Sequence, residues 1–258
     1  TAVELAFLKA TISKDETEMR RRIDELQRDE IYPYLSIRAY YMVYLRMYRH
    51  PIYPRVLSQG KEDPSAILLD VGCCIGTDVR KLVIDGYPAS QVLGIDLRPE
   101  FLTLGHKLYG DAESCRIHFL AADIFALSKP LIAPRAPSSE ATPYIHAGSL
   151  FHIWDEPTQH TLALRLVLLL RRRSGSTIFG RQPGLPEAGV IDDRMQRFRF
   201  GHSPASWTSL WKTVFEAVDG PEFASTRVKV EAELILGDPS VTPGGDTHHV
   251  LFWSVEIL

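Results

Sequence analysis

The sequence has little cysteine and no excess of charge of either sign. Only three of the 258 residues are cysteines, namely Cys73, Cys74 and Cys115. Adjacent cysteines rarely bond to each other and an odd number leaves one over, which argues against a disulfide framework and favours a reducing compartment. The 29 basic residues nearly balance the 32 acidic ones, so the net charge gives no reason to expect nucleic acid as a partner.

Long apolar runs are also missing. The most apolar stretch, residues 162–170, is short and contains Arg165, which excludes a helix that spans a bilayer. The N-terminus lacks the basic region and apolar core of a signal peptide. We therefore expect a cytoplasmic protein without a membrane span, and a chain of this length is enough for one large α/β domain.

A further absence concerns the glycine pattern of residues 67–78, ILLDVGCCIGTD. The apolar run predicts a buried strand with Asp70 at its carboxyl end, followed by a tight turn with two glycines four residues apart. The NAD(P) fingerprint G-x-G-x-x-G fails at its third and sixth positions, which are Cys74 and Thr77. The turn still predicts a ligand at the carboxyl edge of an open α/β sheet.

Strand and helix patterns alternate from Ala66 onward. Strands are predicted over 67–70, 91–96, 115–121, 144–150 and 176–180, and helices over 77–85, 99–109 and 159–172. Ser203 and Pro204 predict the cap and start of another helix. Two final alternating strands, 227–236 and 250–258, have no helix between them and predict an antiparallel pair. The expected fold is α/β, a mostly parallel Rossmann-like sheet with helices on both faces and a C-terminal β-hairpin.

The N-terminal part has a different character. A charge-dense helix is predicted over 15–28, and a second helix over 36–49 that two prolines end. Seven of the ten tyrosines lie between positions 32 and 53. We interpret residues 1–60 as a helical cover over the active site of a core made by 61–258; the alternative is a helix that simply packs on the domain with its hydroxyls at the water boundary.

Three aspartates follow three successive predicted strands. They are Asp70, Asp96 and Asp123. Any one of them alone would be interpreted as a strand-end or helix-cap residue. Together with the glycine turn, they resemble the cofactor site of the class I S-adenosylmethionine methyltransferases, whose motif I is Asp/Glu-x-Gly-x-Gly-x-Gly. Cys74 replaces the middle glycine, and its side chain either faces away from the cofactor or tightens the pocket.

This resemblance implies how S-adenosylmethionine would be held. Asp96 would accept both ribose hydroxyls, Asp123 would accept from the adenine amino group, and Asp70 would lie near the methionine part. The implied cofactor-binding set is Asp70, Gly72, Cys73, Gly76, Asp96, Leu97, Asp123 and Ile124, with Arg38 from the cover near the methionine carboxylate.

Three segments narrow the resemblance further. YPYLSIRAYYMVYLRM, LLDVGCCIGTDVRKLV and VLGIDLRPEF are similar to fungal O-methyltransferases of secondary-metabolite clusters, in particular those of meroterpenoid pathways. The resemblance implies methyl-ester formation on the carboxylate of a hydrophobic polyketide or meroterpenoid acid. A carboxylate with a pKa of about 4 is already ionised at neutral pH and needs no general base. Holding it in line in a dry pocket could supply most of the acceleration.

His152 is the residue that bears on the acceptor. Its segment SLFHIWDE resembles the neighbourhood of the catalytic histidine in plant phenolic O-methyltransferases. A phenol, with a pKa of about 10, needs such a base, so a phenolic O-methyltransferase is the alternative function. His152 could also orient a carboxylate or simply bond to backbone. The remaining histidines and the cysteines show no ligand spacing, and no metal site is predicted.

Aromatic residues on segments that flank the cofactor edge of this fold predict a large apolar substrate. They are Tyr40, Tyr41, Tyr44, Trp154, Trp207 and Trp211. Ordinary core is the alternative interpretation, and it is the favoured one for Trp207 and Trp211. A non-catalytic methyltransferase-like binding domain is a third hypothesis, against which the three aspartates argue. The sequence leaves assembly as a homodimer open.

Overall fold

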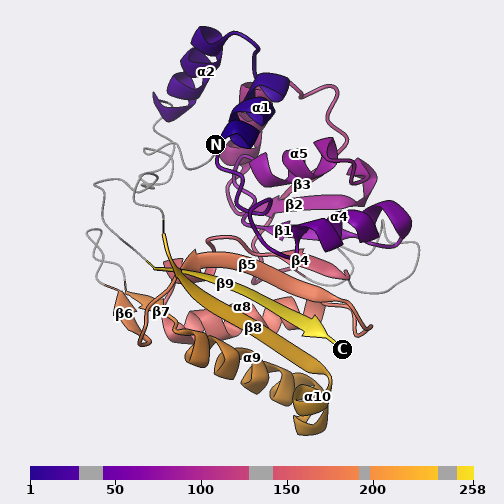
Figure 1. Ribbon diagram of the computed structural model, residues 1–258, viewed down its shortest axis with the longest axis vertical. Coiled ribbons are helices and arrows are strands. Elements are labelled where there is room, and N and C mark those ends of the chain that lie inside the picture. Colours follow the sequence, from indigo (N-terminus) through magenta and orange to yellow (C-terminus); the bar gives the residue numbers. More distant parts are fainter. Residues whose placement is uncertain (29–42, 128–141, 192–197, 238–248) are drawn as a thin grey trace.

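The computed structural model describes residues 1–28, 43–127, 142–191, 198–237 and 249–258. Its centre is a seven-stranded sheet with the strand order β3-β2-β1-β4-β5-β9-β8 (Figure 1). The strands are β1 (Leu68–Val71), β2 (Val92–Asp96), β3 (His118–Ala121), β4 (Tyr144–His146), β5 (Thr177–Pro183), β8 (Val228–Leu236) and β9 (His249–Ile257). The first five pair in parallel, and β9 pairs antiparallel with β5 and β8. The predicted α/β fold and its C-terminal antiparallel pair are confirmed.

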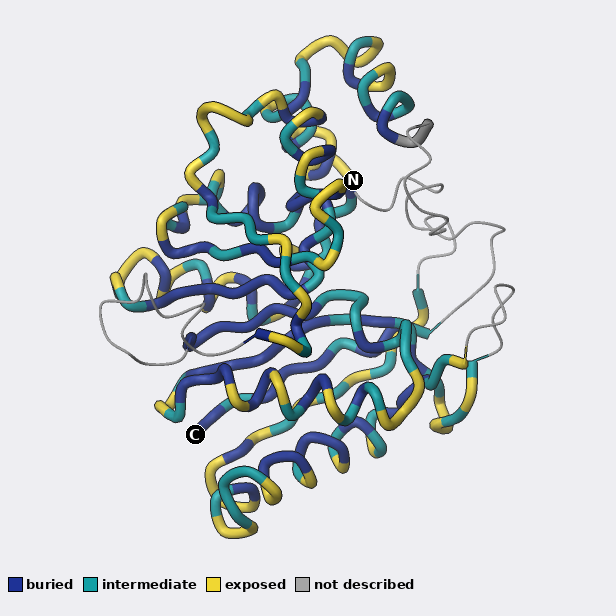
Figure 2. Tube along the Cα trace, turned by 180° about the vertical axis from the view of Figure 1, so that it is seen from behind, coloured by how far each residue is buried: buried dark blue, intermediate teal, exposed yellow. Residues whose placement is uncertain are grey.

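Helices cover both faces of this sheet (Figure 1). The main ones are α4 (Tyr53–Glu62), α5 (Thr77–Ile84), α6 (Pro99–Tyr109), α8 (Glu156–Leu169), α9 (Pro204–Asp219) and α10 (Pro221–Thr226). Because side chains alternate along a strand, Leu68 packs toward α4 and α5, while Leu69 packs toward α8 and α9. Parallel strands covered on both sides are apolar throughout, and in Figure 2 the sheet is accordingly the buried centre.

The N-terminal helices pack on α6. They are α1 (Ala2–Thr11) and α2 (Glu16–Arg28), and their buried Phe7, Met19 and Ile23 share a cluster with Leu104 and Leu108 of α6. Helix α2 agrees with the predicted charge-dense helix, whereas α1 was not predicted. The division into a cover of residues 1–60 and a core of 61–258 stays a prediction.

The other elements in the described ranges are short. They are the 3-10 helices η2 (Ala89–Gln91) and η4 (Phe151–Ile153) and the separate hairpin of β6 (Gly189–Ile191) and β7 (Arg199–Gly201). No helix in the ranges that the structure describes is long and apolar enough to cross a membrane.

Local capping explains where several helices begin and end. Ser203 accepts a hydrogen bond from the backbone of Ser206, and Pro204 occupies the first turn of α9, as the sequence predicts. Helix α6 ends at Gly110 with φ of 63°, a left-handed conformation that glycine adopts at little cost.

Four predictions about element boundaries are wrong. Residues 43–50, the described part of the helix predicted over 36–49, form turns and bends instead. Pro54 lies in the first turn of α4, where proline is tolerated, so it marks a helix start rather than a stop. Strand β4 ends at His146, four residues before its predicted end, because the chain turns at Ser149, whose φ is 53°. Helix α8 begins at Glu156, three residues before its predicted start, where Asp155 caps it.

Candidate active site

The loop between β1 and α5 has the tight geometry that its glycines predict. Gly72 and Gly76 both have φ of 72°, and Cys74 has φ of 53°. A Cβ at Gly76 would lie 2.6 Å from the ring of Phe119, so a side chain does not fit. The Cys74 N–H donates to Oδ2 of Asp96 over 2.8 Å. Asp70, which precedes the turn, and Asp96, which bonds to its backbone, thus both lie at this turn at the carboxyl edge of the sheet.

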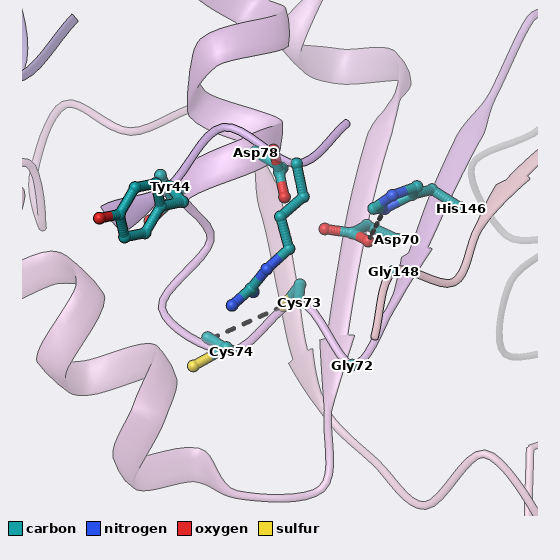
Figure 3. A pocket seen from close by; sticks show the side chains of 10 residues that line it. Tyr44, Asp70, Gly72, Cys73, Cys74, Asp78, His146 and Gly148 are labelled. Atoms are coloured by element: carbon teal, nitrogen blue, oxygen red, sulfur yellow. Dashed lines mark hydrogen bonds and ion pairs between the residues drawn. The ribbon is translucent and has the colours of Figure 1, made fainter. Parts of the chain in front are cut away.

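Asp70 forms a buried pair with a histidine that was not predicted. Nδ1 of His146 lies 2.7 Å from Oδ1 of Asp70, and both side chains are almost fully buried (Figure 3). Burial disfavours the imidazolium, but the charge and hydrogen bond of Asp70 outweigh it and raise the pKa of His146. His146 is directly opposite Asp70 in the β1–β4 register, and Nε2 of its ring is buried without a hydrogen-bond partner in the described structure.

A second acid, the half-buried Asp78, connects residues 43–50 to α5. Oδ1 of Asp78 accepts a hydrogen bond of 2.8 Å from the backbone N–H of Met47. Burial raises the pKa of Asp78, because the charged form loses its hydration. This contact holds the turns of residues 43–50 against the start of α5.

These elements enclose a pocket at the carboxyl ends of β1 and β4 (Figure 3). Its lining consists of Tyr44, Arg46, Asp70, Gly72, Cys73, Cys74, Thr77, Asp78, His146 and Gly148. Of the residues predicted from the sequence, the structure brings Tyr44, Asp70, Gly72 and Cys73 together here. Sequence reasoning missed Arg46 and Asp78 as well as His146. The position of His146 could have been found only by combining the strand order with the strand ends.

The other two aspartate positions lie along the same edge. Burial raises the pKa of Asp96, and its Oδ1 accepts the backbone N–H of Arg98 over 3.0 Å. The neighbouring Leu97 is 63% exposed. Asp123 accepts the N–H of Phe125 over 2.9 Å, so it also fixes its own turn. The structure places these groups at the ends of β2 and β3, in the predicted order, and their cofactor roles stay a prediction.

The residues predicted to bind substrate differ in how far their side chains are buried. Trp207 and Trp211 have no exposed surface and pack with Phe151 and Trp253, which favours the core interpretation. Trp154 is half-buried, with its ring 5.6 Å from that of Phe125. His152 lies in η4 and is half-buried. Arg38, Tyr40 and Tyr41 lie outside the described residues.

The thiols at the turn are held in their protonated form. Burial, and next the charge of Asp96, raise the pKa of Cys74 to about 12, and burial raises the pKa of Cys73. A thiol that stays protonated is a poor nucleophile. Neither cysteine therefore has the properties of a catalytic nucleophile.

Among the described residues, one group of potential metal ligands lies away from the pocket. Ligand atoms of His106, Asp111 and Cys115 lie within 4.8 Å of one another. However, Arg80 binds both carboxylate oxygens of Asp111, over 2.7 and 3.0 Å, and Nδ1 of His106 donates to the same carboxylate. The acid is thus already neutralised by a bidentate ion pair, and its pKa is lowered accordingly, since Arg80 outweighs the opposing effect of burial.

Comparisons with known proteins agree with this geometry. O-methyltransferase phiE of a fungal species (strain ATCC 74256) is 35% identical over 187 residues, which cover 72% of this chain and 61% of phiE. Methyltransferase adrK of Penicillium roqueforti is 34% identical, covering 72% and 66%. Methyltransferase trt5 of Aspergillus terreus is 30% identical, covering 81% and 74%. The chain thus spans less than two thirds of the length of phiE and adrK. No protein-family model matches.

Solved structures show the same fold. Phosphoethanolamine N-methyltransferase 2 of Haemonchus contortus in complex with S-adenosyl-L-methionine has a TM-score of 0.52 at 13% identity, covering 80% of this chain and 52% of that one. A S-adenosylmethionine-dependent methyltransferase of Listeria monocytogenes, described as putative, has a TM-score of 0.51 at 12% identity, covering 80% and 96%. The chain therefore belongs to the family of fungal secondary-metabolite O-methyltransferases that includes phiE, adrK and trt5, and it has the fold of the class I methyltransferases.

Proposed function

We propose that this chain is an S-adenosylmethionine-dependent O-methyltransferase that forms a methyl ester on the carboxylate of a hydrophobic polyketide or meroterpenoid intermediate. The observation that supports the enzyme class most strongly is the pocket at the β1 turn. There Asp70 lies beside the backbone of Gly72 and Cys73, in a chain whose relatives are named methyltransferases.

The residues along this edge fit S-adenosylmethionine. Asp70 offers a buried carboxylate to the cofactor's ammonium group, and Gly72 exposes backbone in a left-handed turn. Each carboxylate oxygen of Asp96 holds one backbone N–H and keeps acceptor capacity for a ribose hydroxyl. The exposed Leu97 offers apolar surface to the adenine ring. Bound there, the cofactor would supply an electrophilic methyl group.

A carboxylate acceptor makes the smallest chemical demand on the protein. It is ionised at neutral pH, so the chain has only to bind it, aim one oxygen at the methyl group and exclude water. The protonated thiols of Cys73 and Cys74 and the carboxylate of Asp70, which is paired with His146, offer no free base at the turn. Positioning therefore accounts for the reaction better than proton transfer does.

Product analysis tests this proposal. The chain is incubated with S-adenosylmethionine labelled in its methyl group and a panel of prenylated aromatic acids and the corresponding phenols, and products are identified by mass spectrometry. We expect label in a methyl ester that mild alkali hydrolyses. Label only in an alkali-stable ether would refute the ester proposal, and the absence of any labelled product would refute the enzyme class.

The alternative, a phenolic O-methyltransferase, is favoured by the place of His152. It lies in η4, which follows strand β4 after a short turn, and it is half-buried. If His152 is a general base, His152→Ala should lower the methylation rate by several orders of magnitude. If His152 only orients the acceptor, the variant should keep most of the ester-forming rate. His160→Ala, on α8, is the matched control, since His160 is also half-buried but lies within a helix.

A further inference from the structure

Two arginines near the pocket, Arg46 and Arg181, have no acid as an ion-pair partner among the residues that the structure describes. Arg46 lines the pocket, and Arg181 lies on β5, whose backbone oxygen at this residue accepts the N–H of Ser149 over 2.7 Å. Ser149 directly follows Gly148, another residue of the pocket lining. The backbone of Arg181 is thus bonded to the residue that follows the pocket lining.

The side chain of Arg181 lies on the same face of the sheet as His50, because both contact the ring of Phe252. Its guanidinium carbon is 5.5 Å from the ring centroid of Phe252, its cross-strand neighbour. The ring of His50 contacts the rings of Phe252 and Phe179, and Phe179 in turn contacts His146. A continuous row of rings therefore connects Arg181 to the buried pair beneath the pocket.

The charge of Arg181 is poorly compensated. The side chain is half-buried, and its Nε is buried with no hydrogen-bond partner among the described residues. Burial, and next the nearby guanidinium of Arg46, lower the pKa of Arg181 to about 10. Within the described ranges, no carboxylate lies within ion-pair distance of either arginine.

The acids of the surrounding segments have other partners or lie too far away. Glu4 pairs with Arg49 and with the N-terminal amino group, and Asp70 pairs with His146. Asp78 accepts a hydrogen bond from the backbone N–H of Met47 and forms no ion pair with either arginine. A partly buried cation without a partner is costly. Two of them close together cost more, because like charges repel in a medium of low dielectric constant. A bound anion close to both guanidinium groups would lower this cost.

We propose that Arg46 and Arg181 form a carboxylate-binding site at the border between the cofactor pocket and the end of β5. A guanidinium binds a planar carboxylate through two parallel hydrogen bonds, and two such groups can hold one anion from two sides. The site rests on the proposed function for its occupant, since both the substrate acid and the methionine part of the cofactor carry a carboxylate. Either source satisfies the same chemistry, and the experiment separates them.

The test compares Arg181→Met and Arg46→Met with Arg116→Met, an exposed arginine before β3. Calorimetry measures the affinity for S-adenosylhomocysteine and for 5′-methylthioadenosine, which lacks the amino-acid part. Ligand-observed NMR on the protein saturated with S-adenosylhomocysteine then measures benzoate against benzamide. Weakening of S-adenosylhomocysteine alone, on the order of tenfold or more, assigns the site to the cofactor. A similar weakening of benzoate alone assigns it to the substrate acid.

Thermal unfolding adds a readout that distinguishes binding from a structural role. Because Arg181 carries an uncompensated charge, Arg181→Met should unfold at an equal or higher temperature than the unsubstituted protein while it loses anion affinity. A lower unfolding temperature with unchanged affinities would overturn the proposal, as would affinities that match those of Arg116→Met. Wild-type protein that binds these probes but yields no methyl ester would refute the proposed function and leave the anion site standing.

Discussion

The two faces of the sheet bury different kinds of side chain beside the same strands. On the α8 and α9 side, Phe151, Trp207, Trp211 and Trp253 form a fully buried aromatic cluster with ring centroids 4.8–5.9 Å apart. On the side of α4 and α5, the carboxyl ends of β1 and β4 instead hold the buried pair of Asp70 and His146. The two clusters lie on opposite faces because side chains alternate along a strand. Ala147, the residue after His146, accordingly faces the aromatic cluster.

This difference shows where stability and chemistry are located. Apolar rings gain free energy from burial in proportion to their area, whereas buried ionisable groups cost free energy unless each finds a partner. Left-handed backbone at non-glycine residues, at Cys74 and Ser149, also occurs only beside the polar face among the described residues. Strain and buried charge collect where a ligand is expected. Substitutions on the two faces should therefore change stability and ligand binding to different extents.

The largest effect is expected in the aromatic cluster. Trp207→Ala removes a fully buried indole that contacts Phe151 and Trp253, and we expect the free energy of unfolding to fall by about 3–5 kcal/mol. Urea denaturation measures this. Trp207→Phe, which keeps a ring, should lose less than half as much. Equal losses would show that the cluster does not stabilise the fold through packing.

A smaller effect is expected from the polar pair. Replacing His146 by leucine leaves the carboxylate of Asp70 buried without its charged partner, at a cost of about 1.5–3 kcal/mol. Affinity for S-adenosylhomocysteine should also fall, because Asp70 is no longer oriented toward the pocket. The double variant with Asp70→Asn should be less destabilised than the sum of the single variants. Additive losses would mean that the 2.7 Å contact does not couple the two residues.

These two clusters also differ in how far the sequence predicts them. Asp70, Gly72 and Gly76 were identified because a strand, an acid and a turn follow one another within a few residues, and the order of strands and helices then defines the sheet. His146 depends on which strand lies beside β1, and Arg46 on a segment that folds over the pocket from outside the sheet. Such positions are determined by tertiary packing, which no local pattern records. The burial of Trp207 and Trp211 was favoured because their i, i+4 spacing is typical of a core-facing helix.

Acid should destabilise the fold through two buried histidines. Burial lowers the pKa of His50 and of His202 to about 4, and His50 is neutral because its Nδ1 accepts the N–H of Ile52. A lowered folded-state pKa means that the unfolded chain binds protons first. Stability is therefore complete above about pH 6.5 and falls as the pH drops toward 4, by on the order of 1–3 kcal/mol for each histidine.

Urea denaturation between pH 7 and pH 4 measures this loss. His202→Asn should flatten the dependence in this window, because His202 contacts Ser206 and aromatic rings rather than an acid. His146 should behave in the opposite way, since its pKa is raised and its contribution is lost as the pH rises. A variant at His202 whose stability depends on pH as steeply as that of the wild type would contradict this assignment.

The smallest effect is expected at Cys74, the residue that replaces the motif glycine. Its φ of 53° costs a side chain about 1–2 kcal/mol, while glycine costs about 0.5–1 kcal/mol of additional chain entropy. Cys74→Gly should therefore stabilise the fold by less than about 1 kcal/mol, whereas Cys74→Val, branched at Cβ, should destabilise it. Thermal unfolding of both variants measures the two signs. If both substitutions destabilise, the thiol contributes packing against Ile75 and its neighbours that outweighs the strain, and the cysteine is then a stabilising replacement for glycine at this turn.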